Sequence, residues 1–163
     1  MADLKTFAPA QFLRDEELRK GIELLYFAYR DLVSDPDEVL AEYGFGRAHH
    51  RVIHFVGRRP GMAVADLLQI LSITKQSLSR VLGTLVAEGY IRQEKGTEDR
   101  RQRLLYLTDK GRELENKLAS LQRERMARAY RESGAEAVAG FWRVLLGLID
   151  EDQRATIQEF VTS

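Results

Sequence analysis

Residues 62–90, MAVADLLQILSITKQSLSRVLGTLVAEGY, constrain the fold of this chain more than any other stretch. The spacing of their apolar residues predicts two short helices, each with one buried side, joined at Ser72 and Ile73. Thr74 is expected to cap the second helix, and Gly89 to end it in the left-handed conformation. Two helices joined by so short a turn form a helix-turn-helix. The predicted buried residues are Val64, Leu67, Leu68, Leu71, Leu78, Val81, Leu82 and Leu85.

Two strand-like segments follow directly, at residues 90–94 and 103–107, and both contain β-branched or aromatic side chains. The polar segment between them, KGTEDRRQ, is too long for a two-residue turn. A β-hairpin that directly follows a helix-turn-helix is a wing. The predicted fold class is therefore mainly α with a small β-hairpin wing: a winged helix-turn-helix over residues 47–111, flanked by N- and C-terminal helices.

On the N-terminal side, residues 15–33 predict an amphipathic helix, because apolar positions recur at spacings of three and four. The segment SDPDE at 34–38 is expected to break this helix before a short second one. A further helix is predicted over 47–56, closed by RRPG at 58–61. The apolar stripe of the first helix consists of Leu18, Ile22, Leu25, Tyr26, Tyr29, Leu32 and Val33.

On the C-terminal side, helices are predicted over residues 108–133 and 136–149, interrupted at Gly134, and a last one starts from an Asp-rich cap at 150–152. The second of these helices has an apolar side formed by Phe141, Leu145 and Leu148. The flanking helices are long relative to the central module. Their apolar stripes therefore need a partner, either each other or a second chain.

The chain carries 25 basic and 25 acidic side chains, but these are unevenly distributed. Residues 47–111 hold 12 Lys and Arg against 6 Asp and Glu, whereas residues 1–46 hold 5 against 10. A basic centre in a neutral protein is typical of a nucleic-acid-reading module inside a larger scaffold. A charged surface that is merely solvated is the alternative at this point.

The exposed side of the second helix of the motif carries the first set of candidate site residues. Lys75 and Arg80 have the chemistry to bind guanine edges or phosphates, and Gln76 to pair with adenine. Serines at positions 77 and 79 can reach phosphates or bases, because the N-terminal half of a recognition helix enters the major groove. The alternative is an ordinary solvated helix face. The predicted DNA-binding residues of this helix are Thr74, Lys75, Gln76, Ser77, Ser79 and Arg80.

The hairpin carries the second set. Arg100, Arg101 and Arg103 lie at its tip and at the start of the returning strand. A tip this narrow can enter a minor groove, whose negative potential attracts a guanidinium, while neighbouring arginines hold phosphates. Asp99 is expected to brace Arg101 by a charge-assisted hydrogen bond. We predict that Asp99, Arg100, Arg101 and Arg103 form a DNA-binding wing.

The combined pattern resembles that of MarR-type transcriptional regulators. The resemblance is carried by ITKQSLSRVLGTLVAEGYI at 73–91 and DRRQRLLYLTDKG at 99–111, with helices on both sides. The stretches GFGRAHHRVIHFVGRRPG and ITKQSLSRVL further resemble the PetP-like branch of the family. The family's wing pattern is Asp-x-Arg followed by Leu-Thr-x-x-Gly, and it is met by Asp99, Arg101, Leu107, Thr108 and Gly111.

This resemblance implies a single MarR-type domain over residues 1–163, with residues 12–46 and 112–163 as dimerisation helices. It implies a homodimeric regulator, a repressor or a dual regulator, whose two winged lobes read a palindromic operator in double-stranded DNA. Arg101 would be the minor-groove arginine. Many members also bind a small-molecule effector between the dimerisation helices and the DNA-binding lobes and then release DNA. The chain has no cysteine, which excludes thiol-based sensing.

Three histidines suggest an alternative, a metal-responsive regulator using His49, His50 and His54. His50 and His54 are four apart on a predicted helix, so both could face one metal ion. Without a cysteine or an obvious carboxylate on that helix, however, the ligand set is incomplete. A structural or pocket-lining role is favoured, and no metal or other cofactor is expected.

Catalysis is not expected either. Ser77 or Ser79 could be imagined in a triad with His54, but neither serine lies on a strand-to-helix elbow with flanking glycines. The glycines at 44–46 lack the spacing and the lysine of a phosphate-binding loop. A winged-helix module that docks an acidic protein partner is the remaining alternative function.

The sequence shows no apolar run long enough to span a membrane, and its N-terminus has no signal-peptide pattern. We therefore expect a soluble, cytoplasmic protein without a membrane partner.

Overall fold

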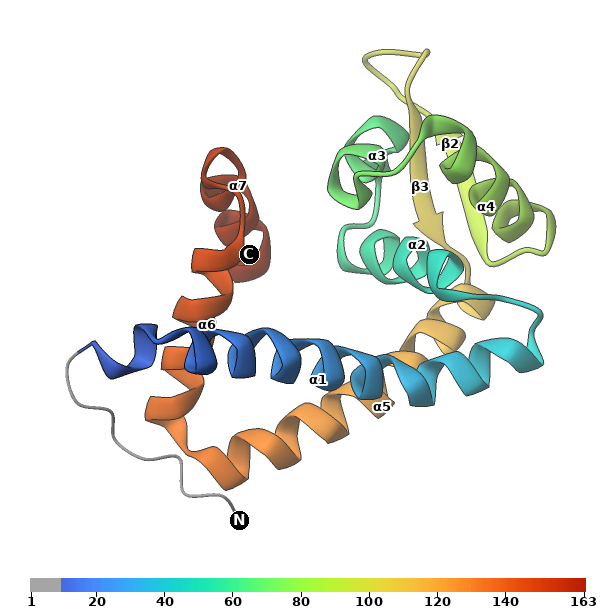
Figure 1. The fold of residues 1–163 in the computed structure, drawn as a ribbon. Helices are drawn as coiled ribbons and strands as arrows, with labels where there is room; N and C mark the ends of the chain where they lie inside the picture. The colour runs from blue at the N-terminus through green and yellow to red at the C-terminus, as the bar shows by residue number, and fades with distance from the viewer. Residues whose placement is uncertain (1–9) are drawn as a thin grey trace. The chain divides into compact units, whose positions relative to one another are not determined.

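The computed structural model describes residues 10–163, so the first nine residues of the expected domain over 1–163 lie outside the described part (Figure 1). The chain forms two compact units, one up to Gln122 and one from Arg123 to Ser163. No helix in residues 10–163 is both long and apolar enough to cross a membrane.

The predicted fold class is confirmed: helices dominate, and one small antiparallel sheet lies in the first unit. A short 3-10 helix, η1, precedes the first α-helix. In chain order the elements are η1 (Gln11–Leu13), α1 (Asp15–Glu42), α2 (Arg47–Arg58), β1 (Met62–Ala63), α3 (Val64–Leu71), α4 (Lys75–Ala87), β2 (Ile91–Lys95), β3 (Arg103–Leu107), α5 (Asp109–Ser133), α6 (Ala135–Leu148) and α7 (Glu151–Thr162).

The core of the first unit lies among α2, α3, α4 and the sheet (Figure 1). As predicted, α3 and α4 form the helix-turn-helix, and Gly89 follows α4 with a positive φ of 80°. The end of α1 and the start of α5 also contribute to this core, through Leu40 and Leu114. Its fully buried side chains include Leu40, Val52, Ile53, Val56, Leu67, Leu78, Leu85, Ile91, Leu105 and Leu118.

The sheet has three strands in the order β1-β3-β2, not only the two strands of the predicted hairpin. Met62 pairs with Leu105, and the N–H of Gly61 donates to the carbonyl of Leu105 at 2.7 Å. Gly61 has a φ of 84°, a conformation that lets the chain turn from α2 into this strand. A two-residue strand has no periodicity of its own, so only its pairing with β3 defines it.

The predicted break of the first helix at residues 34–38 was wrong, because α1 runs without interruption through a buried Pro36. A proline has no N–H, so the carbonyl of Leu32, one turn earlier, loses its helical donor. The side-chain amide of Gln122, on α5, donates to this carbonyl at 3.4 Å. Burial of Val33 and Leu40 on the same helix adds packing energy that holds the segment in place. A long-range contact thus offsets the local cost of the proline.

The second unit contains the end of α5 followed by α6 and α7. Gly134, with a φ of 83°, separates α5 from α6 as predicted. The Arg154 guanidinium of α7 donates to the carbonyls of Gly147 and Ile149 at 2.9 and 2.8 Å, which joins the last two helices. The indole N–H of Trp142 donates to the Tyr130 hydroxyl at 2.9 Å.

Apolar side chains remain exposed within each unit. In the first unit most of them lie on η1 and the N-terminal part of α1, and in the second on α6 and α7, where none of the described residues is buried. The predicted stripes are therefore exposed over most of their length, whereas Leu32 and Leu145 are half-buried and Val33 is buried. The exposed side chains are Phe12, Leu13, Leu18, Ile22, Leu24, Leu25, Tyr26, Phe27, Tyr29, Tyr43 and Ile70, and then Phe141, Trp142, Val144, Leu148 and Val161.

The contact between Gln122 and Leu32 can be tested by a double-mutant cycle. Gln122→Ala should lower the free energy of unfolding by about 1 kcal/mol, because it leaves the Leu32 carbonyl without a donor. In a Pro36→Ala background the backbone N–H of position 36 supplies that donor, so the same change should cost little. Denaturant unfolding of the four proteins measures the coupling, and additive effects would contradict this account.

Candidate nucleic-acid interface

The turn before α4 is closed by a hydroxyl cap. The Oγ1 atom of Thr74 accepts a hydrogen bond from the backbone N–H of Ser77 at 3.1 Å, as the sequence predicted. The Thr74 hydroxyl in turn donates to Oγ of Ser77 at 2.8 Å, and Ser77 is half-buried. Both side chains therefore hold the first turn of the helix.

The exposed side of α4 presents four of the six predicted residues together. Leu78 and Val81 face the core, whereas the two polar side chains between them and the first two side chains of the helix are exposed. This side has two cations and two neutral polar groups, the chemistry needed for contacts with phosphates and base edges. The exposed residues are Lys75, Gln76, Ser79 and Arg80.

At the wing tip, hydrogen bonds to Asp99 hold the Arg101 side chain in place. The Oδ1 atom of Asp99 accepts hydrogen bonds from the backbone N–H of Arg101 at 2.9 Å and from its Nε at 3.2 Å, and Oδ2 accepts from Nη2 at 3.4 Å. The backbone bond and then the side-chain bonds lower the pKa of Asp99, so it stays ionised at neutral pH. The Arg101 side chain is 92% exposed. The predicted brace is thus present, and it leaves the guanidinium open to a ligand.

The remainder of the tip is a closed turn. The Gly96 N–H donates to the Gln102 carbonyl, and the Gln102 N–H to the Asp99 carbonyl, both at 3.1 Å. A Cβ on Gly96 would lie 2.5 Å from the Asp99 carbonyl oxygen, so this position requires glycine. Arg103 donates from Nη1 to the Arg100 carbonyl at 3.4 Å. In Figure 1 the loop between β2 and β3 projects beyond the helices of the lobe.

The Leu-Thr-x-x-Gly part of the wing pattern has a structural role. The Thr108 hydroxyl donates to the Gly89 carbonyl at 2.6 Å, and its oxygen accepts from the Gly111 N–H at 3.1 Å. A Cβ on Gly111 would lie only 2.1 Å from the Tyr90 carbonyl oxygen. Leu107 is buried in the core. These residues fasten the start of α5 and the wing to the end of α4, a contact that sequence reasoning did not anticipate.

The three histidines divide between two places. His50 and His54 line one pocket of about 150 Å³, and burial lowers the pKa of His50, so its neutral form is favoured. His49 instead stacks on Phe45, with ring centroids 4.7 Å apart. Within residues 10–163 no three His, Cys, Asp or Glu side chains are grouped to hold a metal ion.

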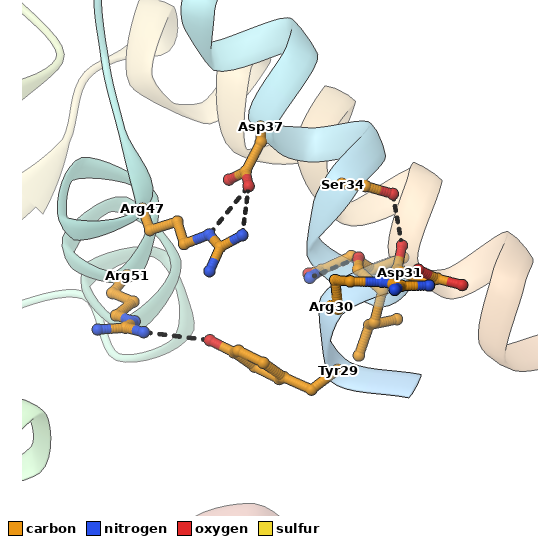
Figure 2. A network of polar contacts seen from close by, with 9 residues as sticks. Tyr29, Arg30, Asp31, Ser34, Asp37, Arg47 and Arg51 are labelled. Carbon is orange, nitrogen blue, oxygen red and sulfur yellow. Dashed lines mark hydrogen bonds and ion pairs between the residues drawn. The ribbon is translucent and has the colours of Figure 1, made fainter. Parts of the chain in front are cut away.

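The pocket beside His50 and His54 lies in a polar network that joins α1 to α2. Figure 2 shows Arg47 paired with Asp37 at 2.9 Å, and Arg51 donating from Nη2 to the Tyr29 hydroxyl at 3.1 Å. The pocket lining includes two arginines and two histidines but no carboxylate. The lining residues are Tyr29, Val33, Arg47, His50, Arg51, His54, Phe55 and Gln122.

Known proteins resemble this chain in both sequence and fold. The model of the MarR family matches residues 43–102, which hold the helix-turn-helix and most of the wing tip. The HTH-type transcriptional regulator PetP of Rhodobacter capsulatus is 50% identical over 147 residues, which cover 90% of this chain and 89% of that protein. The chain belongs to the MarR family.

Solved MarR-family structures share its fold at low sequence identity. Streptococcus pneumoniae FabT in complex with DNA has a TM-score of 0.71 and 19% identity, over 80% of this chain and 94% of that one. A mutant MarR from E. coli complexed with operator DNA has a TM-score of 0.64 and 20% identity, over 86% and 99% of the two chains. The family is one of transcriptional regulators.

The close approach of Gly111 to Tyr90 has a measurable consequence for this MarR-family protein. Gly111→Ala should lower the free energy of unfolding by at least about 2 kcal/mol, because the backbone atoms it would meet can move only if the lobe shifts. Gly83→Ala, on α4, is the matched control, since its Cβ would meet nothing within 4 Å and alanine favours a helix. Equal stabilities of the two variants in thermal unfolding would refute the assignment.

Proposed function

We propose that this protein is a sequence-specific DNA-binding transcriptional regulator that acts as a homodimer on a palindromic operator. One observation carries the proposal: an exposed arginine, oriented by Asp99, stands at the tip of a wing in the same unit as the exposed polar side of α4. Membership of the MarR family and the 50% identity to a transcriptional regulator support it.

In this proposal each lobe reads DNA through two elements. The N-terminal half of α4 enters the major groove, where Gln76, Ser79 and Arg80 reach base edges and Lys75 a phosphate. Arg101 enters the adjacent minor groove, attracted by its negative potential. Because Asp99 already restricts the Arg101 side chain, less conformational entropy is lost on binding than for a free arginine. Arg100 and Arg103 hold the phosphates on either side.

A second copy of the chain is the partner that the exposed apolar side chains require. Exposed aromatic and aliphatic residues on α1 and on α6 and α7 make apolar surfaces of the kind that mark protein interfaces. A two-fold dimer would cover the same surface on both protomers and present two lobes to DNA. A regulator of this kind works where the chromosome is, which places it in the cytoplasm.

Selection from random double-stranded DNA tests the proposed function. The expected result is a two-fold-symmetric sequence whose half-sites lie about one helical turn apart, roughly 34–36 Å centre to centre. Recovery of no preferred sequence would refute the proposal. Binding to an acidic protein in place of DNA would instead support the interaction module that the basic central region also allows.

The two arginines of the wing tip should differ in their effects on operator affinity. Arg101→Ala should cost about 1–3 kcal/mol and relax preference at the base pairs beneath the wing. Arg100 is a neighbour without the Asp99 brace. Arg100→Ala should therefore weaken binding to all DNA sequences alike, and should reduce the slope of log affinity against log salt concentration by about one. Fluorescence titrations at several salt concentrations separate the two. Unchanged affinity of Arg101→Ala would contradict its role in the groove.

We further propose that binding of a small anion in the pocket between α1 and α2 controls this activity. The Arg51 guanidinium binds the Tyr29 hydroxyl there. The lining itself has no carboxylate, and the neighbouring Asp37 and Glu115 contact Arg47 and His54, not Arg51. The pocket volume of about 150 Å³ is large enough for a ligand the size of a benzene ring. An anion that bound Arg51 would displace the Tyr29 hydroxyl and so loosen the link between α1 and α2.

Thermal-shift measurements with benzoate and with the cation benzylamine test the pocket. Benzoate should raise the melting temperature and weaken DNA binding, whereas benzylamine should do neither. Arg51→Met should abolish the benzoate effect while DNA binding without ligand persists. Equal shifts by both compounds would contradict an anion site.

A further inference from the structure

An aromatic cluster joins the long helices to the DNA-binding lobe. It contains Tyr43 at the end of α1, Phe45 and His49 at the start of α2, and Tyr90 after α4. Phe45 is buried; its ring stacks on His49 at 4.7 Å and meets Tyr90 edge-on at 5.2 Å. The ring centroid of Tyr43 lies 6.4 Å from the ring centroids of both Phe45 and Tyr90. A change in His49 therefore acts where α1, α2 and α4 meet.

His49 also caps α2. Its Nδ1 atom accepts a hydrogen bond from the backbone N–H of Gly46 at 3.1 Å. This is the half of a capping box that the third residue supplies, and Gly46, the N-cap, has no side chain to supply the other half. Nδ1 can accept only while the imidazole is neutral, since both ring nitrogens of a protonated histidine are donors. Glutamine, which with glutamate is the usual residue at this position, accepts at any pH. The cap of α2 in this chain is thus one that a single proton can remove.

The surroundings of His49 include charges from two other elements. Glu88, directly after α4, favours a protonated His49, as does the backbone of Gly46, whereas Arg80 on α4 disfavours it. From α5, the ammonium groups of Lys110 and Lys117 already lie over the rings of Tyr90 and Tyr43, at 4.2 and 5.7 Å from the centroids. A protonated His49 would bring a third cation to the same cluster. It would also stand beside Arg80, a predicted DNA-contacting residue.

We propose that His49 is a proton-sensitive element of the DNA-binding lobe: its protonation breaks the cap of α2 and loosens the junction between the long helices and the lobe. Mild acid then weakens DNA binding, a step that rests on the proposed function. The effect on the fold of the lobe does not rest on it.

The direction of the effect follows from linkage. Burial lowers the pKa of His49 below its ordinary value of 6.5. A group with a lowered pKa contributes stability that is fully present above pH 6.5 and is lost as the pH falls through the pKa of the folded state. The relevant window is therefore below pH 6.5. Asp99 does not titrate in this window, because its pKa lies below its usual value of 3.8.

The test compares the full-length wild type with H49Q and H50Q between pH 7.5 and 5.0, at fixed protein and salt concentration. H49Q keeps an acceptor for the Gly46 N–H but does not titrate. H50Q leaves that bond intact and removes His50, whose pKa is also lowered by burial, so it measures the part of the pH dependence that belongs to His50. Denaturant unfolding measures the stability of the lobe. Fluorescence titration measures binding to the fragment recovered by selection. The ring-proton resonances of His49, followed by NMR in the wild type, report its protonation without any substitution.

Acidification should raise the unfolding equilibrium constant of the wild type by a factor of about three to thirty more than that of H49Q, the range expected for loss of one helix cap. The DNA affinity of the wild type should fall further than that of H49Q over the same interval. Equal pH dependence of H49Q and the wild type would overturn the proposal, as would an NMR midpoint above 6.5. If no DNA fragment is recovered, the proposed function fails, and the unfolding and NMR measurements still decide the role of His49.

Discussion

The close contact between Gly111 and the Tyr90 carbonyl is the constraint around which the first unit is organised. Thr108 adds a hydroxyl bond to the Gly89 carbonyl, and its backbone N–H donates to the Tyr90 carbonyl at 3.0 Å. Within three residues the chain thus closes the wing, caps α5 and packs that helix against the end of α4. Any side chain at position 111 would push these elements apart. The orientation of the wing relative to α4 therefore depends on a glycine at this position.

The same region couples the long helices to the surface that we propose for DNA. The aromatic cluster around Phe45 connects α1 and α2 to Tyr90, while Arg47 and Arg51 link α2 to α1 through Asp37 and Tyr29 (Figure 2). Neither link is a buried apolar contact alone. We propose that each contains a group whose hydrogen bonding changes with a proton or an anion, so that solution conditions act on the lobe at this junction.

Much of the candidate interface could be predicted from sequence because its determinants are local. The cap of Thr74, the left-handed turn at Gly89 and the brace of Arg101 by Asp99 each act between residues two to four apart or at a single position. The part that local reasoning assigned less well is Ser77, which is half-buried and whose hydroxyl accepts a hydrogen bond from Thr74. The three histidines illustrate another limit. A spacing of four placed His50 and His54 in one pocket, but it could not show that His49 stacks on Phe45.

By itself, the sequence determined the helix-turn-helix, the wing and the polar residues on them, since helical periodicity, caps and turn residues depend on neighbours along the chain. Only the tertiary structure decided where α1 ends, because the donor that replaces the N–H of Pro36 comes from Gln122, far away in the sequence. It also decided the third strand, since Met62 and Ala63 become a strand only by pairing with β3. At Pro36 the local preference for a helix break was overridden, and at Met62 and Ala63 there was no local preference. In both cases a residue that is distant in sequence and close in the fold set the conformation.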